Sequence, residues 1–280
     1  MLYQEGLKTL RKGYEKGVSK NQFLKTGFRK FDKKFGGIYK KGVTVIGGTY
    51  QEDLTNLGVS LLKNISINQD IPTYYISFHD IELDIVKKIT SSFLKIKMKK
   101  IISGKLNNKE KAKIDKLLKA NKILPTYIIN NIKRTTIDIT YLVKNLIFEK
   151  KPNLILIDRF NEVQGNRNDK IKLIESLKSI SQNTGVPFIL LYELGDSGNI
   201  NNVGRKTLLE NLNSDLFLKS MSDCIVYLDD SIHYVNDENQ ESKSEKGNSK
   251  LIVRKSKYGK TGNVSLKYKN TLCLFEDISK

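Results

Sequence analysis

The apolar residues of this chain gather into short continuous runs rich in β-branched and aromatic side chains. Continuous runs, as opposed to alternating ones, are typical of strands that are covered on both faces. Each of the four prolines directly precedes such a run, at a position where a strand tolerates a missing N–H. The runs are VTVIGG (43–48), TYYISF (73–78), TYIIN (126–130), NLILID (153–158), FILLY (188–192) and DCIVYL (223–228).

Segments with apolar residues at intervals of three and four separate these runs and predict amphipathic helices. They cover residues 55–67, 81–97, 109–121, 136–149 and 169–182. Alternating strands and helices imply a mainly parallel sheet with helices on both faces. From about residue 223 onward the strand-like runs HYVN, SKLIVRK, NVSLKY and LCLFED follow one another without helices and predict antiparallel hairpins. We therefore predict an α/β fold.

The first 20 residues predict a separate short helix with Leu2, Leu7, Leu10 and Tyr14 as its apolar residues. A lone amphipathic helix cannot bury its own apolar face, so it must dock on the body of the protein or on another subunit. We accordingly divide the chain into a linker-type helix, 1–20, and a main domain, 21–280. The polar segment 236–249 is expected to be a mobile loop.

The net charge of +19 changes this picture, because it favours a polyanionic partner such as nucleic acid. Of the 49 basic residues 42 are Lys, so A/T-rich coding and a merely solvated basic surface are the alternative explanation. No apolar segment approaches the ~20 residues of a membrane helix, and the N-terminus does not resemble a secretory signal. Cys224 and Cys273 lie in apolar runs and are expected to be buried thiols. We expect a cytoplasmic protein without membrane contact.

The loop after the first core strand is where a sheet of this kind binds its ligand. A phosphate-binding loop there reads GxxxxGK[ST], and this chain has Gly48, Asp53, Leu54 and Thr55 at the four defined positions. Leu54 provides no cation, and Glu52 and Asp53 place carboxylates where an anion would bind. Repulsion between a carboxylate and a phosphate in a partly buried site is on the order of several kcal/mol. Glu52 and Asp53 predict either a solvated acidic turn or, with Asp158, a cation site.

Five segments in order resemble the C-terminal, RecA-like motor domain of bacterial and phage replicative DNA helicases of the DnaB type. They are TGFRKFDKKFGGIYKKGVTVIGG (26–48), LILIDRFNEV (154–163), GVPFILLYEL (185–194), RKSKYGKTGNVSLKY (254–268) and LFED (274–277). The resemblance spans about residues 20 to 278 and implies a RecA-like fold. It identifies Gly48, Thr55 and Asp158 as remnants of the nucleotide site, with Thr55 as the loop hydroxyl and Asp158 as the Walker B carboxylate.

Several positions depart from that family's pattern and imply a degenerate Walker A motif and a pseudo-ATPase. Leu54 replaces the lysine, and His79 stands in place of the catalytic Glu, although it also suits a polar cap at a strand end. Glu193 replaces the Gln that senses the γ-phosphate. In the basic finger that reaches a neighbouring subunit, Lys255 and Lys257 remain, but Lys257 replaces an Arg and cannot form its bidentate fork. No cofactor is therefore expected; ATP and Mg would be needed only if the site were active.

The resemblance also implies that two loops face a central channel and contact DNA. Their cations are Arg159, Arg167 and Lys170 in the first loop and Arg205 and Lys206 in the second. Loops with sparse cations suit sequence-independent contact with phosphates.

The leading hypothesis is a non-hydrolysing helicase relative that acts in DNA replication or its control. It would bind single-stranded or double-stranded DNA and form a homo-oligomer, or a hetero-oligomer with an active replicative helicase. The alternatives are a divergent but active ATP-dependent DNA helicase and a protein-interaction scaffold that does not bind DNA.

Overall fold

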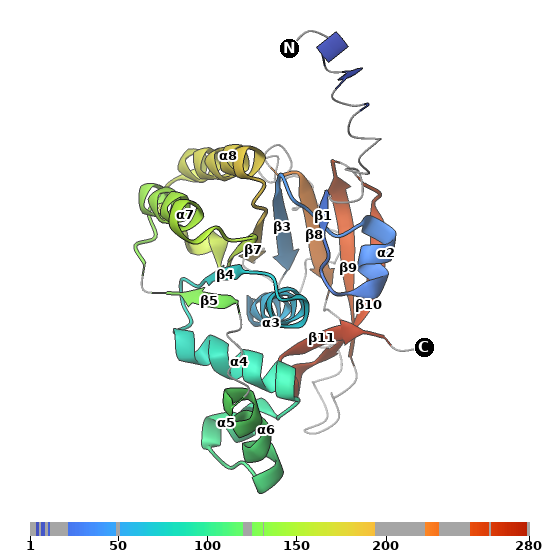
Figure 1. The fold of residues 1–280 in the computed structure, drawn as a ribbon, viewed down its shortest axis with the longest axis vertical. Helices are drawn as coiled ribbons and strands as arrows, with labels where there is room; N and C mark the ends of the chain where they lie inside the picture. The colour runs from blue at the N-terminus through green and yellow to red at the C-terminus, as the bar shows by residue number, and fades with distance from the viewer. Residues whose placement is uncertain are drawn as a thin grey trace, which may run out of the picture.

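The computed structural model describes residues 4–5, 7–8, 11, 22–48, 51–119, 125–130, 132–193, 222–229, 247–257 and 259–278. Its main sheet has nine strands in the order β11-β10-β9-β8-β3-β7-β6-β4-β5 (Figure 1). The parallel strands are β3 (Val43–Gly48), β4 (Thr73–Ile76), β5 (Thr126–Ile129), β6 (Leu154–Ile157), β7 (Phe188–Glu193) and β8 (Cys224–Asp229). The antiparallel strands are β9 (Gly247–Ser256), β10 (Gly262–Lys269) and β11 (Leu274–Asp277). The RecA-like α/β fold with antiparallel hairpins at its C-terminal end is confirmed.

All six apolar runs form strands of this sheet, and SKLIVRK, NVSLKY and LCLFED form β9, β10 and β11. HYVN and most of 236–249 lie outside the described residues. One expectation about burial is wrong, because β5 is not covered on both faces. It lies at the edge of the sheet, its residues are half-buried or exposed, and Tyr127 is 43% exposed.

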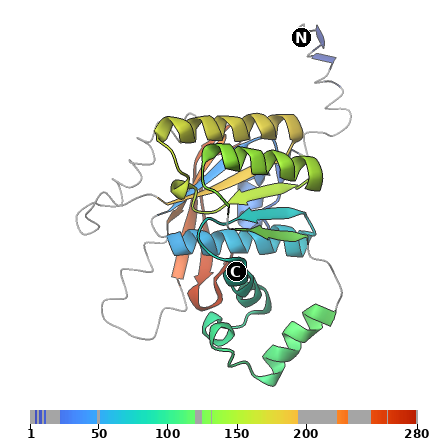
Figure 2. The ribbon, with the colours of Figure 1, turned by 90° about the vertical axis from the view of Figure 1, so that its left-hand side faces the viewer.

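The helices form two layers on the sheet, each with its own apolar core (Figures 1 and 2). One layer contains α3 (Gln51–Leu62), which continues as the π-helix η2 (Lys63–Ile67), and α4 (Glu82–Leu94). The other contains α7 (Thr136–Lys150) and α8 (Arg167–Thr184). The remaining helices are α2 (Arg29–Phe35), α5 (Met98–Ser103), α6 (Asn108–Lys119) and the 3₁₀ turns η3 (Phe160–Glu162) and η5 (Asn270–Leu272).

Three short elements were not predicted: α2, α5 and the two-stranded sheet of β1 (Phe23–Leu24) and β2 (Ile38–Tyr39). The segment 81–97 is also not one helix, because α4 ends at Leu94 and Lys95 adopts the left-handed conformation. Of the predicted N-terminal helix the structure describes five positions, all of them helical. How 1–20 relates to the main domain stays a prediction.

The two cysteines are free thiols; Cys273 is buried and Cys224 is half-buried. Among the described residues, no helix combines the length and the apolar character needed to cross a membrane.

Candidate functional site

The candidate site lies where β3, β7 and β6 end side by side at their carboxyl ends. Gly48, the last residue of β3, pairs in register with Glu193, the last residue of β7. Asp158 directly follows β6, and Thr55 lies just over one turn into α3. In parallel sheets this edge is the usual ligand-binding edge. The fold therefore brings together four positions that were identified from the sequence alone.

Asp158 is the centre of a buried hydrogen-bond cluster. The Thr55 hydroxyl and the Tyr75 hydroxyl both donate to its Oδ2 at 2.8 Å, and the Arg159 backbone N–H donates to Oδ1 at 2.9 Å. The Asp158 side chain is fully buried, and this burial raises the pKa of its carboxyl although the hydrogen bonds oppose the shift. The predicted pair of Thr55 and Asp158 is thus in direct contact, and Tyr75 joins it.

The Leu54 side chain occupies the apolar interior next to this cluster. It is fully buried, and it lies so close over Gly48 that a β-carbon there would come within 3.0 Å of Leu54 Cδ2. Leu228 of β8 borders the same space. At the position of the lysine in GxxxxGK[ST], this chain therefore has a packed core residue that directs no polar group toward the sheet edge.

The connection between β3 and α3 is shorter than the loop from Gly48 to Thr55 that the motif GxxxxGK[ST] implies. The strand ends at Gly48 and the helix begins at Gln51, so the positions from Gln51 to Thr55 are helical. The prediction that helix 55–67 begins only at Thr55 is wrong for a physical reason. Residues 49–54 contain no glycine, and acidic residues in a first turn favour a helix N-terminus.

Asp53 is not part of a solvated acidic turn, and that interpretation is wrong for this residue. Asp53 is 2% exposed, and its side chain faces Tyr268 of β10. The burial of Tyr268 raises the pKa of its hydroxyl, and the nearby Asp53 carboxylate raises it further. Asn56 Nδ2 also donates to the Tyr268 hydroxyl at 2.8 Å. The side chain of Glu52 lies outside the described residues. Among the side chains that the structure describes, no group of acidic, His and Cys residues could hold a metal ion.

His79 and Glu193 lie at the same sheet edge. His79 is exposed, three residues beyond the end of β4. The Glu193 side chain is half-buried, and the Glu193 backbone N–H donates to Asn161 Oδ1 at 3.4 Å. Whether His79 serves as a cap or in proton transfer stays a prediction.

Two of the three cations of the first predicted DNA loop, Arg159 and Lys170, are bound within the loop itself. Arg159 Nη1 lies 3.3 Å from Glu162 Oε1, and the same carboxylate pairs with Arg134 at 2.6 Å. Lys170 Nζ donates to the Asn161 carbonyl at 2.8 Å, and burial lowers the pKa of Lys170. Arg167, the first residue of α8, is exposed. Arg205 and Lys206 lie outside the described residues.

Lys255 and Lys257 lie at the opposite end of the sheet from Gly48. Lys255 Nζ donates to the Ser222 carbonyl at 2.6 Å, and Lys257 Nζ is 3.6 Å from Asp223 Oδ1. Both partners precede β8, whereas Gly48 pairs with Leu228 near the end of that strand. Strands rise ~3.3 Å per residue, so these lysines are more than about 10 Å from Gly48 of their own chain.

Sequence reasoning missed Tyr75, Arg134 and Tyr268 as parts of this site. Tyr75 belongs to a strand that was read as uniformly apolar, and Tyr268 lies more than 200 residues from Asp53. A tyrosine within a strand covered on both faces was the one available signal, since a buried hydroxyl needs a partner.

Comparisons with known proteins agree with this fold. The family model described as "DnaB-like helicase C terminal domain" matches residues 24–277. A probable replicative DNA helicase of Trieres chinensis is 25% identical over 263 residues, which are 91% of this chain and 57% of that protein. Replicative DNA helicase DnaB of Treponema pallidum is 20% identical over 258 residues, which are 90% of this chain and 55% of that protein. The chain spans somewhat more than half the length of these relatives.

Solved structures share the fold. One of them, the structure of an ATPase domain, has a TM-score of 0.78 at 19% identity, and the match covers 99% of both chains. A DnaB-like replicative helicase, solved in a study of its interactions with primase, has a TM-score of 0.78 at 18% identity. That match covers 98% of this chain and 66% of the helicase chain.

Proposed function

Because this chain belongs to the DnaB-like helicase C-terminal domain family, we propose that it acts in DNA replication as a member that does not hydrolyse ATP. The observation that carries the proposal is the buried Leu54 at the lysine position of the phosphate-binding loop. A nucleoside triphosphate needs cations and backbone N–H groups around its phosphates. The residues at this edge do not fit such a group.

The electrostatics of the site support the same conclusion. Glu193 brings a carboxylate to the residue that pairs with Gly48, and Asp158 adds a second one, which accepts from the Thr55 hydroxyl. A phosphate a few Å from such carboxylates is repelled by several kcal/mol, an amount comparable with a millimolar binding free energy of about 4 kcal/mol. We therefore propose that the chain needs neither ATP nor Mg, and that Asp158 has a structural role.

The proposed activity is binding, both to DNA and to other subunits. The relatives' names are those of replicative helicases, and the net charge of +19 favours DNA as the ligand. We propose homo-oligomers, or insertion into the oligomer of an active replicative helicase, with Lys255 and Lys257 on the surface that faces a neighbour. A divergent active ATPase would need such a lysine from a second subunit, because both lie far from Gly48 in their own chain.

Thermal melting with Mg·ATP tests the nucleotide part of this proposal. We expect no shift in Tm at millimolar Mg·ATP, since a ligand that does not bind the folded state cannot stabilise it. Leu54→Lys should restore neither a shift nor hydrolysis, because the carboxylates remain. A DnaB helicase with an intact GxxxxGK[ST] loop is the positive control. ATP hydrolysis by the unmodified chain that is lost in Asp158→Asn would overturn the proposal.

A further inference from the structure

The helical hairpin of α5 and α6 carries a dense positive charge. Residues 97–119 contain nine lysines and only two acidic residues, whereas the whole chain has 42 lysines in 280 residues. The lysines are Lys97, Lys99, Lys100, Lys105, Lys109, Lys111, Lys113, Lys116 and Lys119. This segment supplies +7 of the net charge of +19, and none of the motifs considered above accounts for it.

Most of this charge is not neutralised within the protein. The Glu110 carboxylate is already bound to Lys100 at 2.7 Å and to the Asn107 backbone N–H at 3.0 Å. Six of the lysines form no ion pair with any residue that the structure describes: Lys99, Lys105, Lys109, Lys111, Lys116 and Lys119. No residue of α5 or α6 is buried.

Three of these lysines form a stripe on one side of α6. Lys109, Lys116 and Lys119 are exposed and follow each other at seven and three residues, a spacing that places them on the same side of a helix. The stripe is about 15 Å long at 1.5 Å per residue. Glu110, Ile114 and Leu117, which are half-buried, lie on the other side. The packing of α6 therefore turns this stripe toward solvent.

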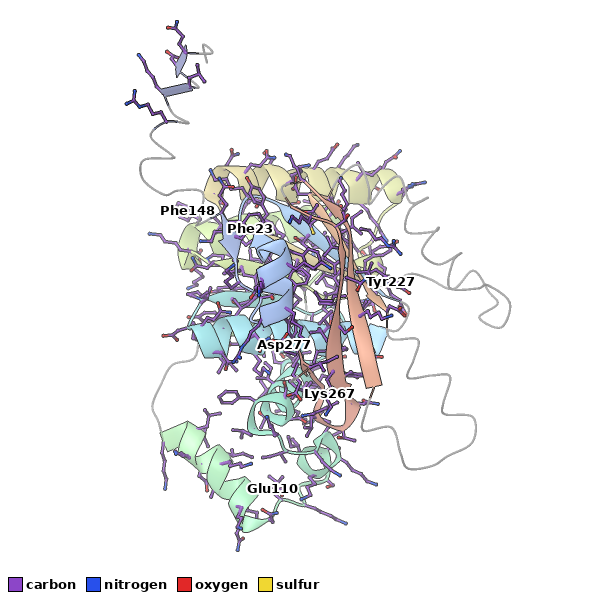
Figure 3. The ribbon with its side chains drawn as sticks, turned by 90° about the vertical axis from the view of Figure 1, so that its right-hand side faces the viewer. Phe23, Glu110, Phe148, Tyr227, Lys267 and Asp277 are labelled. Carbon is purple, nitrogen blue, oxygen red and sulfur yellow. The ribbon has the colours of Figure 1, made fainter. Side chains whose placement is uncertain are left out.

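The hairpin lies at the far end of the molecule from α7 and α8. In Figures 1 and 2 it extends beyond α4, while α7 and α8 cover the opposite face of the sheet. Figure 3 labels Glu110 on this projecting hairpin. A ligand bound to the stripe would therefore not compete with one at the loop of Arg159 and Lys170.

We propose that the α5–α6 hairpin is a second nucleic-acid contact, which binds the phosphate backbone of duplex DNA. The inference rests on the DNA binding proposed above and adds a separate site to it. Residues 97–119 contain no aromatic side chain, so they cannot stack on bases as single-strand binding proteins do. The lysines can therefore contact only the phosphates. A duplex presents one phosphate charge per ~1.7 Å of its axis, twice the density of one strand, and so it is the stronger ligand for the stripe.

The experiment compares two triple variants that remove the same charge. K109Q/K116Q/K119Q removes the stripe, and K144Q/K150Q/K172Q removes three exposed lysines from α7 and α8. Fluorescence anisotropy gives Kd for a 20-base-pair duplex and a 20-nucleotide single strand between about 25 and 200 mM NaCl. For the duplex, we expect the stripe variant to reduce the slope of log K against log salt by about 2.7. Its affinity at the lowest salt should fall at least about tenfold.

The controls separate this site from a general effect of charge. The α7–α8 variant should bind the duplex nearly as well as the unmodified chain, and K109R/K116R/K119R should keep the slope. Equal losses in the two glutamine variants, or no loss in the stripe variant, would overturn the inference. The inference would also be overturned if the stripe variant lost binding to phosphatidylserine vesicles but kept its binding to the duplex.

The single-strand arm distinguishes failure of the inference from failure of the proposed function. Duplex binding through the stripe without any single-strand binding contradicts the proposed loop contacts and leaves the hairpin site standing. Single-strand binding with an unchanged duplex slope contradicts only the hairpin site. A chain that binds neither nucleic acid contradicts both.

Discussion

Two hydroxyl groups donate to one buried oxygen of Asp158, and this arrangement makes Tyr75 a structural residue. Tyr75→Phe removes only the hydroxyl that is 2.8 Å from Asp158 Oδ2. Loss of a buried hydrogen bond that leaves its partner without a donor costs about 1–3 kcal/mol, so the free energy of unfolding at pH 7 should fall by about 2 kcal/mol. Urea denaturation measures this change.

Tyr74→Phe is the matched control for this prediction. Tyr74 precedes Tyr75 on β4, its ring stacks on Tyr127, and its hydroxyl has no hydrogen-bond partner among the described residues. We expect this variant to change the free energy of unfolding by less than about 0.5 kcal/mol. Equal effects of the two substitutions would show that the hydrogen bond from the Tyr75 hydroxyl to Asp158 contributes nothing to stability.

The pKa of Asp158 sets the pH dependence of the same effect. Burial raises this pKa above its ordinary value, so the folded state holds the proton more tightly than the unfolded chain. The contribution of Asp158 to stability therefore falls as the pH rises from about 4 through the folded-state pKa. Because the Tyr75 hydroxyl stabilises the ionised form, Tyr75→Phe should cost more at pH 7 than at pH 4.

The pair of Thr55 and Asp158 was identified from the sequence because Thr55 stands at the hydroxyl position of GxxxxGK[ST] and the resemblance to DnaB-type helicases assigns Asp158 to the Walker B carboxylate. It did not identify the contact of Asp53 with Tyr268, because that contact depends on how β10 is placed against α3. From the sequence alone, the Asp53 carboxylate after β3 was expected to be solvated, because nothing in the sequence shows which element covers it. Burial of polar groups by residues distant in sequence was the part that could not be predicted.

Among the helices, α8 shows most clearly how local sequence fixes an element next to the site. Asn166 and Asp169 form a capping box, in which each side chain accepts from the other residue's backbone N–H at 3.1 and 3.0 Å. Asn166→Ala should lower the free energy of unfolding by about 1 kcal/mol, because one N–H of the first turn loses its acceptor. Thermal or urea denaturation measures this loss.

Asn168→Ala is the control within the same turn of α8. Asn168 is exposed, and its side chain forms no hydrogen bond with the described residues. Its replacement should change the free energy of unfolding by less than about 0.5 kcal/mol. A cost for Asn168→Ala equal to that for Asn166→Ala would contradict the cap as the source of stability.

The core strands could be predicted from the sequence because both faces of each are covered, which requires continuous apolar runs. Edge strand β5 shows the same run while only half-buried, so the pattern overstates its burial. The short helices α2 and α5 escaped prediction because seven and six residues give too few apolar repeats for a period. The start of α3 at Gln51 was not predicted, because the motif GxxxxGK[ST] implies a loop up to Thr55 and these residues were therefore expected to be non-helical.

The net charge of +19 affects the stability of the molecule as well as its choice of partner. Like charges repel in the compact state, and salt screens them, with a Debye length of ~30 Å at 0.01 M and ~10 Å at 0.1 M. Raising NaCl from about 10 to 300 mM should therefore raise Tm by roughly 3 °C, the shift expected for about 1 kcal/mol in a chain of this size. Differential scanning calorimetry without DNA measures it. KCl should act like NaCl, because screening depends on ionic strength alone, and a Tm that stays constant or falls with salt would contradict this account.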